Sequence, residues 1–495
     1  MADHSSDALF MARNPSTGEN LSPINVTPLA EVAKRVEQAR SAQAHWAETS
    51  WPSRRRLLKR WIAHLARDAE GWAEAIRQEI GKPRGEGLAE LITSLDAMRW
   101  TARHGWRALK EERLGAGWQS LLLIPGACVR HRPRGVIGIL GTWNYPIFLN
   151  APAIAQALAA GNAVVWKPSE LAPLMGARLQ RSLVEAGLPE NLVVQVQGGV
   201  EVGKALMAAR IDKGMYTGGV TGGEQVLGSL GTRAIPSLAE LSGMDPAIVL
   251  PDAPLEPTVK ALAWGAFVGC GQTCVAVKRV FVVGYVKPWV EALGALAGRL
   301  RVGDPALGEV DMGPMISESA RSRFQDQLQK AIDAGAEVVS GGNALAGPGW
   351  FHAPTVLLAR SPAPEQALSG VFGPVVVVRE VRSTVEAIVA ANMSPFGLAA
   401  SVWGRDLDSA RAVGAQLEAG TVTINDAVTP IGHASAPFGG WKSSGYGRIR
   451  GIHGMREFLQ TQVEQSRRPG GFRPHLFPYS ARLAAMLKGY LRLYR

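Results

Sequence analysis

Apolar residues recur three or four positions apart over residues 29–113, as Val32, Val36, Leu57 and Trp61 illustrate. This spacing places them on one face of a helix, so we expect the chain to begin with a helical segment. From residue 135 onward the pattern changes to short apolar runs separated by helical stretches. Strands that alternate with helices in this way are typical of a parallel sheet with crossover helices.

This alternation occurs in two series. The first predicts strands at 135–140, 163–166 and 192–197, a helix at 152–160, and a helix capped by Ser169 and Glu170 that runs to about Ala186. The second predicts strands at 247–250, 280–283, 375–378 and 421–425, with helices at 258–267 and 320–334. We therefore expect an α/β fold with two doubly wound parallel-sheet domains, each with its own core.

Two other segments do not follow the alternation. Residues 121–124 and 128–132 flank Pro125-Gly126, a pair that favours chain reversal, so we expect a two-stranded projection there. After Arg467 acidic residues are absent, Pro469-Gly470-Gly471 interrupts the pattern, and the last stretch predicts a basic amphipathic helix. We expect this tail to dock on its own subunit or a neighbour, and peripheral contact with an anionic membrane is the alternative.

Composition narrows the class of protein. A chain of 495 residues with 46% apolar and 19% charged residues is typical of a folded globular protein of several structural units. The apolar stretches fall short of the ~18 to 20 residues that a membrane crossing needs, and residues 1–10 lack the layout of a secretory signal. Three cysteines indicate a reducing compartment, so we expect a cytoplasmic protein. The net charge of +11 is scattered without interleaved aromatic residues, and we expect no nucleic-acid partner.

Cys274 closes the glycine-rich run Gly269-Cys270-Gly271-Gln272-Thr273-Cys274. Most cysteines are buried small hydrophobes, but Gly271 and Gln272 are poor core residues. A glycine turn that enters a helix would leave the thiol reachable and place backbone N–H groups near it, which favours the thiolate. We therefore interpret Cys274 as a nucleophile and Cys270 as a packing residue.

Two further side chains fit a reaction at a thiol. Glu240 stands among apolar residues at a predicted strand end, where desolvation raises the pKa of a carboxyl group toward the range in which it takes a proton from water. Most glutamates are solvated and have no such role. Asn144, in Trp143-Asn144-Tyr145-Pro146, is either a turn residue or, if its loop faces Cys274, a donor to an oxyanion.

Two segments at predicted strand ends are candidates for ligand binding. Lys167-Pro168-Ser169-Glu170 follows a buried strand, where it either caps a helix or offers a lysine and an acid to a ligand. Residues 218–223 precede a helical stretch that we expect from Glu224, and their backbone N–H groups could meet a pyrophosphate. Paired histidines and cysteines and a Gly-x-Ser-x-Gly elbow are absent from the sequence, so we expect neither a metal site nor a serine hydrolase.

Seven motifs in order together resemble the NAD(P)-dependent aldehyde dehydrogenase superfamily, over about residues 14–464. They are Trp143-Asn144-Tyr145-Pro146, Lys167-Pro168-Ser169-Glu170, Gly218 with Gly223, Glu240, Gly271-Gln272-Thr273-Cys274, Phe372-Gly373-Pro374 and Pro437-Phe438-Gly439-Gly440. The resemblance implies a dinucleotide-binding domain (1–113 and 135–240), a catalytic domain (241–443), an oligomerisation element (114–134 and 456–468) and a basic tail (469–495). It also implies a homodimer or homotetramer.

The resemblance assigns roles residue by residue. It makes Cys274 the nucleophile, Asn144 with the Cys274 N–H the oxyanion hole, and Glu240 the base that hydrolyses a thioester. It places the cofactor at Trp143, Lys167, Ser169, Glu170, Gly218, Gly219, Gly223, Leu241 and Phe372. A carboxylate at Glu170 should repel a 2′-phosphate, so NAD is expected and NADP is the alternative. The walls of an aldehyde pocket would be Tyr145, Trp264, Thr273, Val275 and Phe438, which favours an apolar aldehyde.

Four positions depart from the family pattern. Gly370 stands where a glutamate commonly binds the nicotinamide ribose, Gly269 where an asparagine is common, Gly219 where a small polar residue is usual, and Ser242 where a glycine follows the base. We expect an active enzyme with weak cofactor binding or slow hydride transfer. The alternatives are a member that transfers its acyl group to coenzyme A or phosphate, which Glu240 argues against, and a catalytically silent scaffold.

Overall fold

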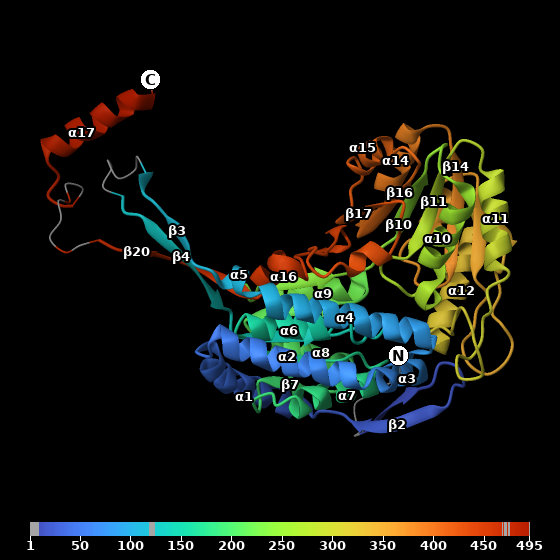
Figure 1. Ribbon diagram of the computed structural model, residues 1–495, viewed down its shortest axis with the longest axis horizontal. Coiled ribbons are helices and arrows are strands. Elements are labelled where there is room, and N and C mark those ends of the chain that lie inside the picture. The colour runs from blue at the N-terminus through green and yellow to red at the C-terminus, as the bar shows by residue number, and fades with distance from the viewer. Residues whose placement is uncertain (1–8, 118–123, 468, 470–472, 474–475, 495) are drawn as a thin grey trace. The chain divides into compact units, whose positions relative to one another are not determined.

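The computed structural model describes residues 9–117, 124–467, 469, 473 and 476–494. The chain divides into two compact units, Met1–Ala108 with Pro133–Leu459 and Leu109–Arg132 with Gln460–Arg495. The first unit holds two large sheets with their helices, and the second holds a small sheet and the C-terminal helix. The mixed α/β class with parallel sheets, expected from the alternating pattern, is confirmed (Figure 1).

A six-stranded sheet follows the first series of alternating elements. Its order is β19-β9-β8-β5-β6-β7, and all neighbours run parallel except β19 against β9. The strands are β5 (Val136–Leu140), β6 (Ala163–Lys167), β7 (Val193–Gln195), β8 (Lys213–Thr217), β9 (Ser237–Glu240) and β19 (Gly445–Tyr446). The chain leaves β5 toward β6 and later returns to β8 on its other side. In such sheets ligands bind outside the carboxyl ends of the strands, at this switch in direction.

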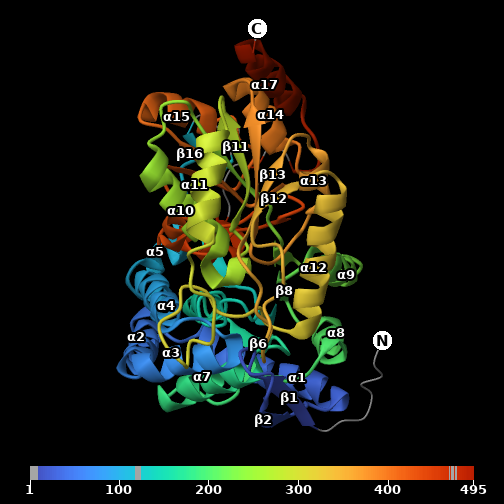
Figure 2. The ribbon, with the colours of Figure 1, turned by 90° about the vertical axis from the view of Figure 1, so that its right-hand side faces the viewer.

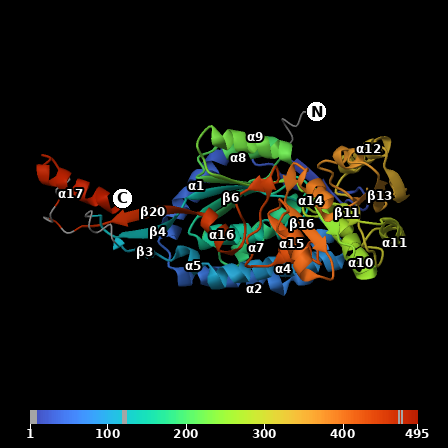
Figure 3. The same ribbon diagram turned by 90° about the horizontal axis from the view of Figure 1, so that it is seen from above.

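Helices cover both faces of this sheet because their apolar stripes must be buried. Helices α1, α8 and α9 pack against one face, while α6 and α7 cover the other and α2 and α4 lie against α6 (Figure 3). Their bounds are α1 (Leu29–Ala47), α2 (Trp51–Arg67), α3 (Ala69–Ile80), α4 (Arg84–His104), α5 (Trp106–Leu109), α6 (Ala151–Ala159), α7 (Pro173–Glu185), α8 (Val200–Ala208) and α9 (Val220–Gly231). The N-terminal helical segment thus supplies α1 to α5 and ends before Arg113.

The second series of elements forms a seven-stranded sheet of order β12-β13-β14-β11-β10-β16-β17, with only β12 antiparallel among its described pairs. The strands are β10 (Asp245–Val249), β11 (Val277–Val283), β12 (Glu337–Ser340), β13 (Thr355–Ala359), β14 (Val375–Val381), β16 (Ala399–Trp403) and β17 (Thr421–Ile424). One face packs on α10 (Leu255–Phe267), α11 (Lys287–Ala297) and α12 (Glu318–Asp333), and the other on α14 (Thr384–Asn392) and α15 (Leu407–Gly414) (Figure 2).

Short elements complete the first unit. They are the hairpin β1 (Leu9–Arg13) and β2 (Asn20–Asn25), the helices α13 (Ala363–Ala367) and α16 (Gly451–Glu457), and the pair β15 (Phe396–Gly397) and β18 (Trp441–Lys442). No helix in the described part of the chain is long and apolar enough to span a bilayer.

In the second unit β3 (Glu112–Leu114), β4 (Ala127–Pro133) and β20 (Leu459–Gln465) form a sheet of order β20-β4-β3. Strand β4 agrees with the strand expected at 128–132, but its partner in the structure is β3 and not the segment 121–124. Ile124 lies in no strand, and residues 121–123 of the expected strand lie outside the described residues. Helix α17 (Ala481–Leu491) follows, with Ser480 accepting a hydrogen bond from the Leu483 N–H as its cap.

Two helix starts also differ from expectation. Helix α7 begins at Pro173 rather than after Ser169, whose hydroxyl instead accepts a hydrogen bond from Leu171 N–H, 3.2 Å away. Proline fixes the backbone angle φ that the first helical turn needs, so Pro173 determines the start. Helix α9 begins at Val220 rather than Glu224, with Gly219 as its N-terminal cap residue.

Candidate active site

The carboxyl ends of the parallel strands carry most of the predicted site. Lys167 is the last residue of β6, Glu240 is the last residue of β9, and Gly218 directly follows β8. Asn144 lies in the loop after β5. Residues that are up to about a hundred positions apart in the sequence therefore meet at one edge of the sheet, as the strand pattern predicted.

The turn that carries Cys274 differs from the prediction. Helix α10 ends at Phe267, and the chain passes Gly269 and Cys270 at positive φ before reaching Cys274, so the thiol follows a helix instead of preceding one. It therefore gains nothing from a helix N-terminus. The Cys274 side chain is partly exposed, whereas Cys270 is buried in the core as expected.

The environment of the Cys274 thiol opposes ionisation. Burial raises its pKa to about 12, the Glu240 and Asp245 carboxyl groups add to the rise, and the backbone N–H groups of Val275 and Cys274 partly offset it. These surroundings contradict the predicted preference of Cys274 for the thiolate. The sequence did not reveal that the buried Glu240 and Asp245 carboxyl groups lie near the Cys274 sulfur.

Glu240 and Cys274 are brought together by the turn after β9. A side-chain carbon added to Gly243 would lie 2.3 Å from the Cys274 carbonyl oxygen, so this glycine lets the two segments touch. Glu240 is 4% exposed, and neither of its carboxylate oxygens has a hydrogen-bond partner among the described residues. Burial raises the pKa of this carboxyl group well above its usual value, as the sequence predicted.

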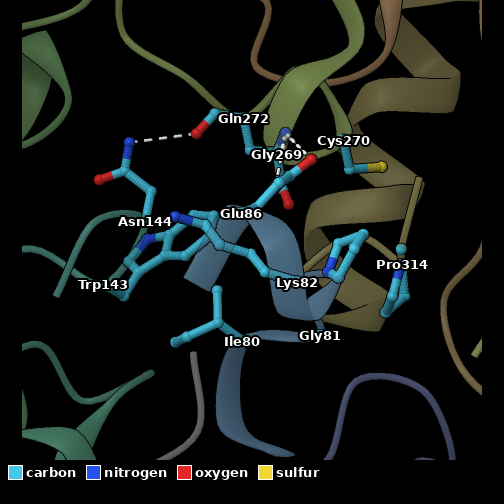
Figure 4. Close-up of a pocket in the computed structure, with 12 residues that line it drawn as sticks. Ile80, Gly81, Lys82, Glu86, Trp143, Asn144, Gly269, Cys270, Gln272 and Pro314 are labelled. Atoms are coloured by element: carbon cyan, nitrogen blue, oxygen red, sulfur yellow. Dashed lines mark hydrogen bonds between the residues drawn. The ribbon is translucent and has the colours of Figure 1, made fainter. Parts of the chain in front are cut away.

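Asn144 contacts the turn that carries Cys274. Its amide Nδ2 donates to the Gln272 carbonyl over 3.1 Å, as the dashed line in Figure 4 shows, and its Oδ1 accepts from the Thr142 hydroxyl at 2.8 Å. The next residue, Tyr145, shares a hydrogen bond of 2.8 Å with the Thr273 hydroxyl. The loop after β5 therefore faces the turn that carries Cys274, which was the condition for an oxyanion donor.

Three charged residues at the start of α4 support this arrangement and were missed in the sequence. Glu86 accepts hydrogen bonds from the Gly269 N–H at 3.1 and 3.3 Å, in a small pocket that Trp143, Asn144 and Gln272 also line (Figure 4). Glu90 pairs with Lys82 at 2.8 Å and accepts the N–H of Ile147 at 2.8 Å. The Lys82 ammonium lies 3.5 Å from the centre of the Tyr145 ring.

Lys278, also unforeseen, joins the nucleophile turn to the Phe372-Gly373-Pro374 segment. Its ammonium donates to the Gly271 carbonyl at 2.8 Å and to the Gly373 carbonyl at 2.5 Å. A side-chain carbon on Gly271 would lie 2.3 Å from the Gly373 carbonyl oxygen. The loop bearing Phe372 is thus held directly against the turn bearing Cys274.

The residues predicted to hold a dinucleotide form a continuous edge. The Lys167 ammonium donates to Glu170, Pro168 O and Gly198 O at 2.9 to 3.0 Å, so its three protons position Glu170. Burial alone would raise the pKa of Glu170, but Lys167 and hydrogen bonds outweigh it and hold the pKa below its usual value.

The start of helix α9 suits the phosphates of a dinucleotide. No side chain caps this helix, and a carbon added to Gly219 would meet no atom within 4 Å, so the first N–H groups of the helix are open to a ligand. Gly223 admits the Leu241 side chain, which would lie 2.6 Å from an added carbon. Trp143 contacts Phe372 edge to face with ring centres 5.8 Å apart. This edge therefore fits a dinucleotide.

The expected pocket walls differ in exposure. Val275 and Phe438 are buried, whereas Trp264 lies on the exposed face of α10 at 47% exposure. Gly370 has φ +72°, and the nearest atom to an added side-chain carbon is in the Phe396 ring, 3.8 Å away. The absent carboxylate therefore leaves an open position. Among the described residues no group of three potential ligands could hold a metal ion.

Comparison with known proteins identifies the family. The model of the aldehyde dehydrogenase family matches residues 2–463. The succinate-semialdehyde dehydrogenase (NADP(+)) of Deinococcus radiodurans is 33% identical over 92% of this chain and 94% of its own. The 4,4'-diapolycopene aldehyde oxidase of Methylomonas sp is 32% identical over 97% and 90%.

Solved structures agree. The aldehyde dehydrogenase of Mycobacterium tuberculosis complexed with NAD+ superposes with a TM-score of 0.89, at 30% identity over 95% of this chain and 96% of its own. The family model covers nearly the whole chain, so it determines the family. The chain belongs to the aldehyde dehydrogenase family and is an NAD(P)-dependent oxidoreductase that converts an aldehyde to a carboxylic acid.

Proposed function

We propose that Cys274 is the nucleophile of this oxidation, Glu240 the base, and Asn144 with the Cys274 N–H the oxyanion hole. The observation that carries this assignment is the contact between the two turns, in which only a glycine at 243 lets the Glu240 segment lie against the Cys274 carbonyl. Asn144 is hydrogen-bonded to Gln272, two residues before the thiol. The base is therefore the last residue of β9, the donor follows the end of β5, and the nucleophile lies in the turn between α10 and β11.

The chemistry follows from these positions. The Cys274 sulfur adds to the aldehyde carbon while the thiol proton passes to solvent water, and the new alkoxide is stabilised by the Asn144 amide and the Cys274 N–H. A dinucleotide held by Lys167, Glu170 and the start of α9 would supply the acceptor for the hydride that leaves this carbon. The resulting thioester on Cys274 is attacked by a water from which Glu240 removes a proton, and the products are the carboxylic acid and the free thiol.

The cofactor edge favours NAD over NADP. Glu170 is held by Lys167 with a pKa below its usual value, so it is anionic at neutral pH and repels a 2′-phosphate. We assign Ser169, Gly218, Gly219, Gly223, Leu241 and Phe372 with Trp143 to the same cofactor edge. The open position at Gly370 and the bare Gly219 weaken this binding, because each lacks a side chain that could contact the cofactor.

An aldehyde panel with each cofactor tests the function. Following NADH or NADPH absorbance, we expect turnover of apolar aldehydes, because Tyr145, Val275 and Phe438, which we assign with Thr273 to the pocket walls, are apolar or aromatic, with higher kcat/KM for NAD. Equal kcat/KM with NADP would contradict the role of Glu170. Calorimetry showing no NAD binding would favour the silent scaffold, and activity only with added coenzyme A or phosphate would favour acyl transfer.

The second unit is proposed to mediate self-association as a homodimer or homotetramer. In the order β20-β4-β3, β20 is an edge strand, and residues 460–465 on it are exposed, including Val463 at 59%. An exposed edge strand readily pairs with another chain. The cytoplasmic location expected from the cysteine content stays a prediction.

The tail has the chemistry of a membrane-surface segment. No residue of α17 is buried, and Leu487, Leu491 and Tyr494 are exposed beside Lys488 and Arg492. No acidic residue follows Glu464. The Methylomonas relative, matched over 97% of this chain, necessarily aligns with part of the tail beyond Gln465. We infer that α17 binds an anionic bilayer surface, with its apolar side chains in the interface.

Co-sedimentation with vesicles tests the tail. We expect the full chain to pellet with vesicles of anionic phospholipid and much less with neutral ones, while a chain ending at Arg467 stays in the supernatant. A matched R482E/K488E variant should lose pelleting but keep its turnover. Equal behaviour of the full and shortened chains would remove the membrane role, and a smaller native mass of the shortened chain would assign α17 to subunit contacts.

A further inference from the structure

A buried arginine without an assigned role lies beside the catalytic turn. Arg450 is 3% exposed and occupies the link between β19 and α16. Its guanidinium carbon lies 5.1 Å from the centre of the Phe148 ring and 5.0 Å from that of Phe438. It donates to the Ile431 carbonyl through one terminal nitrogen, and its Nε has no hydrogen-bond partner among the described residues. A buried cation that is only partly satisfied needs a compensating charge.

The backbone carries Arg450 toward Glu240. Gly445 of β19 pairs directly with Glu240, and the Leu241 N–H donates to the Ser444 carbonyl at 3.0 Å. Five residues after Gly445, Arg450 is held by its own N–H, which donates to the Gln156 side chain at 3.2 Å. Its φ of +62° is unusual for a residue other than glycine, so the chain keeps a strained backbone at this position.

Other charged groups near Glu240 are less able to compensate it. Arg448 donates to the Gly440 and Gly447 carbonyls at 3.2 and 2.6 Å. Glu457 carries a carboxyl group rather than a cation, and it pairs with Lys213 at 2.5 Å. The Cys274 thiol supplies no positive charge. Among the described residues Arg450 therefore retains an unused Nε donor and Glu240 two unused acceptors, and the pairing of Gly445 with Glu240 brings their backbone segments together.

We propose that Arg450 is a positioning residue, the buried counter-charge that favours the ionised form of Glu240 in hydrolysis of the thioester. This inference rests on the proposed role of Glu240. The Phe148 and Phe438 rings flank the guanidinium. Burial raises the pKa of Glu240, while Arg450, and after it Arg448, lowers it, which agrees with this role.

The sign of the expected effect follows. Without Arg450 the pKa of Glu240 rises further, so less carboxylate is present at a given pH and the loss of rate is largest on the acid side. We expect R450M to move the acid limb of kcat by about one pH unit or more to higher pH. R450K keeps a positive charge and should stay close to the natural protein. R54M, which removes another buried arginine in α2, is the matched control and should leave the limb in place.

Rapid mixing with NAD and aldehyde separates the two steps. For R450M at low pH we expect an initial burst of NADH near one per active site followed by slow turnover, because only hydrolysis is impaired. A parallel fall of burst and turnover with an unmoved acid limb, in R450M or in R450Q should R450M not fold, overturns the inference. If instead E240Q hydrolyses its thioester normally, the proposed function of Glu240 fails, and the inference fails with it for a distinguishable reason.

Discussion

Replacing Cys274 by serine is expected to lower the oxidation rate by on the order of 10⁴-fold or more, because an alcohol at this position is a far weaker nucleophile than a thiol. The measurement is NADH formation with the best aldehyde of the panel. Binding of NAD, followed by calorimetry, should persist, since none of the residues on the cofactor edge is altered.

The other two cysteines supply the controls. C128S lies in the second unit and should keep full turnover, whereas C270S alters a buried side chain and should lower thermal stability more than rate. If C270S abolished turnover while C274S retained it, the assignment of the nucleophile would be wrong.

Replacing Glu240 by glutamine is expected to lower steady-state turnover by about 10²- to 10⁴-fold, the range that a general base commonly contributes. The amide fills the same space but cannot take a proton from water. An NADH burst should remain, because thiol addition and hydride loss precede hydrolysis. Trapped thioester, seen as a mass increase on Cys274, is the direct measurement.

The same variant distinguishes two roles for the base. The Glu240 carboxyl group is among the causes that raise the pKa of Cys274, after burial. Without this anion the pKa of the thiol falls, so iodoacetamide should alkylate Cys274 in E240Q at least as fast as in the natural protein at neutral pH. Slower alkylation would show that Glu240 activates the thiol. It would contradict the proposal that Glu240 acts only in hydrolysis of the thioester.

The residues at the ends of the parallel strands could be predicted, because the carboxyl ends of parallel strands lie at the same edge of a sheet. Buried apolar runs such as 163–167 identify parallel strands, and polar residues just after them, such as Lys167 and Glu170, must then share an edge. The helix starts were less predictable. Ser169 could cap a helix by its residue type, but Pro173 four positions later fixed the actual start, and the two signals compete within one turn.

The surroundings of the Cys274 thiol could not be predicted from the sequence. The run before Cys274 shows a glycine turn but not whether a helix precedes or follows it, and the sign of the effect on the thiol depends on that order. Glu86, Glu90 and Arg450 act across 57 to 210 positions of sequence, as their partners at Ile147, Gly269 and Glu240 show. Local sequence patterns do not predict which charged residue will contact a partner so far away in the sequence.

The backbone conformation at Gly370 limits which residues can replace this glycine. A side chain there would find room, with the nearest atom 3.8 Å away, yet φ +72° belongs to a region that side-chain-bearing residues enter only at a cost of about 1 to 2 kcal/mol. A single substitution of Gly370 by glutamate is therefore penalised by the loop, independently of any gain in cofactor binding. Designers who want a carboxylate here would gain most by also changing residues 368–371 so that φ becomes negative.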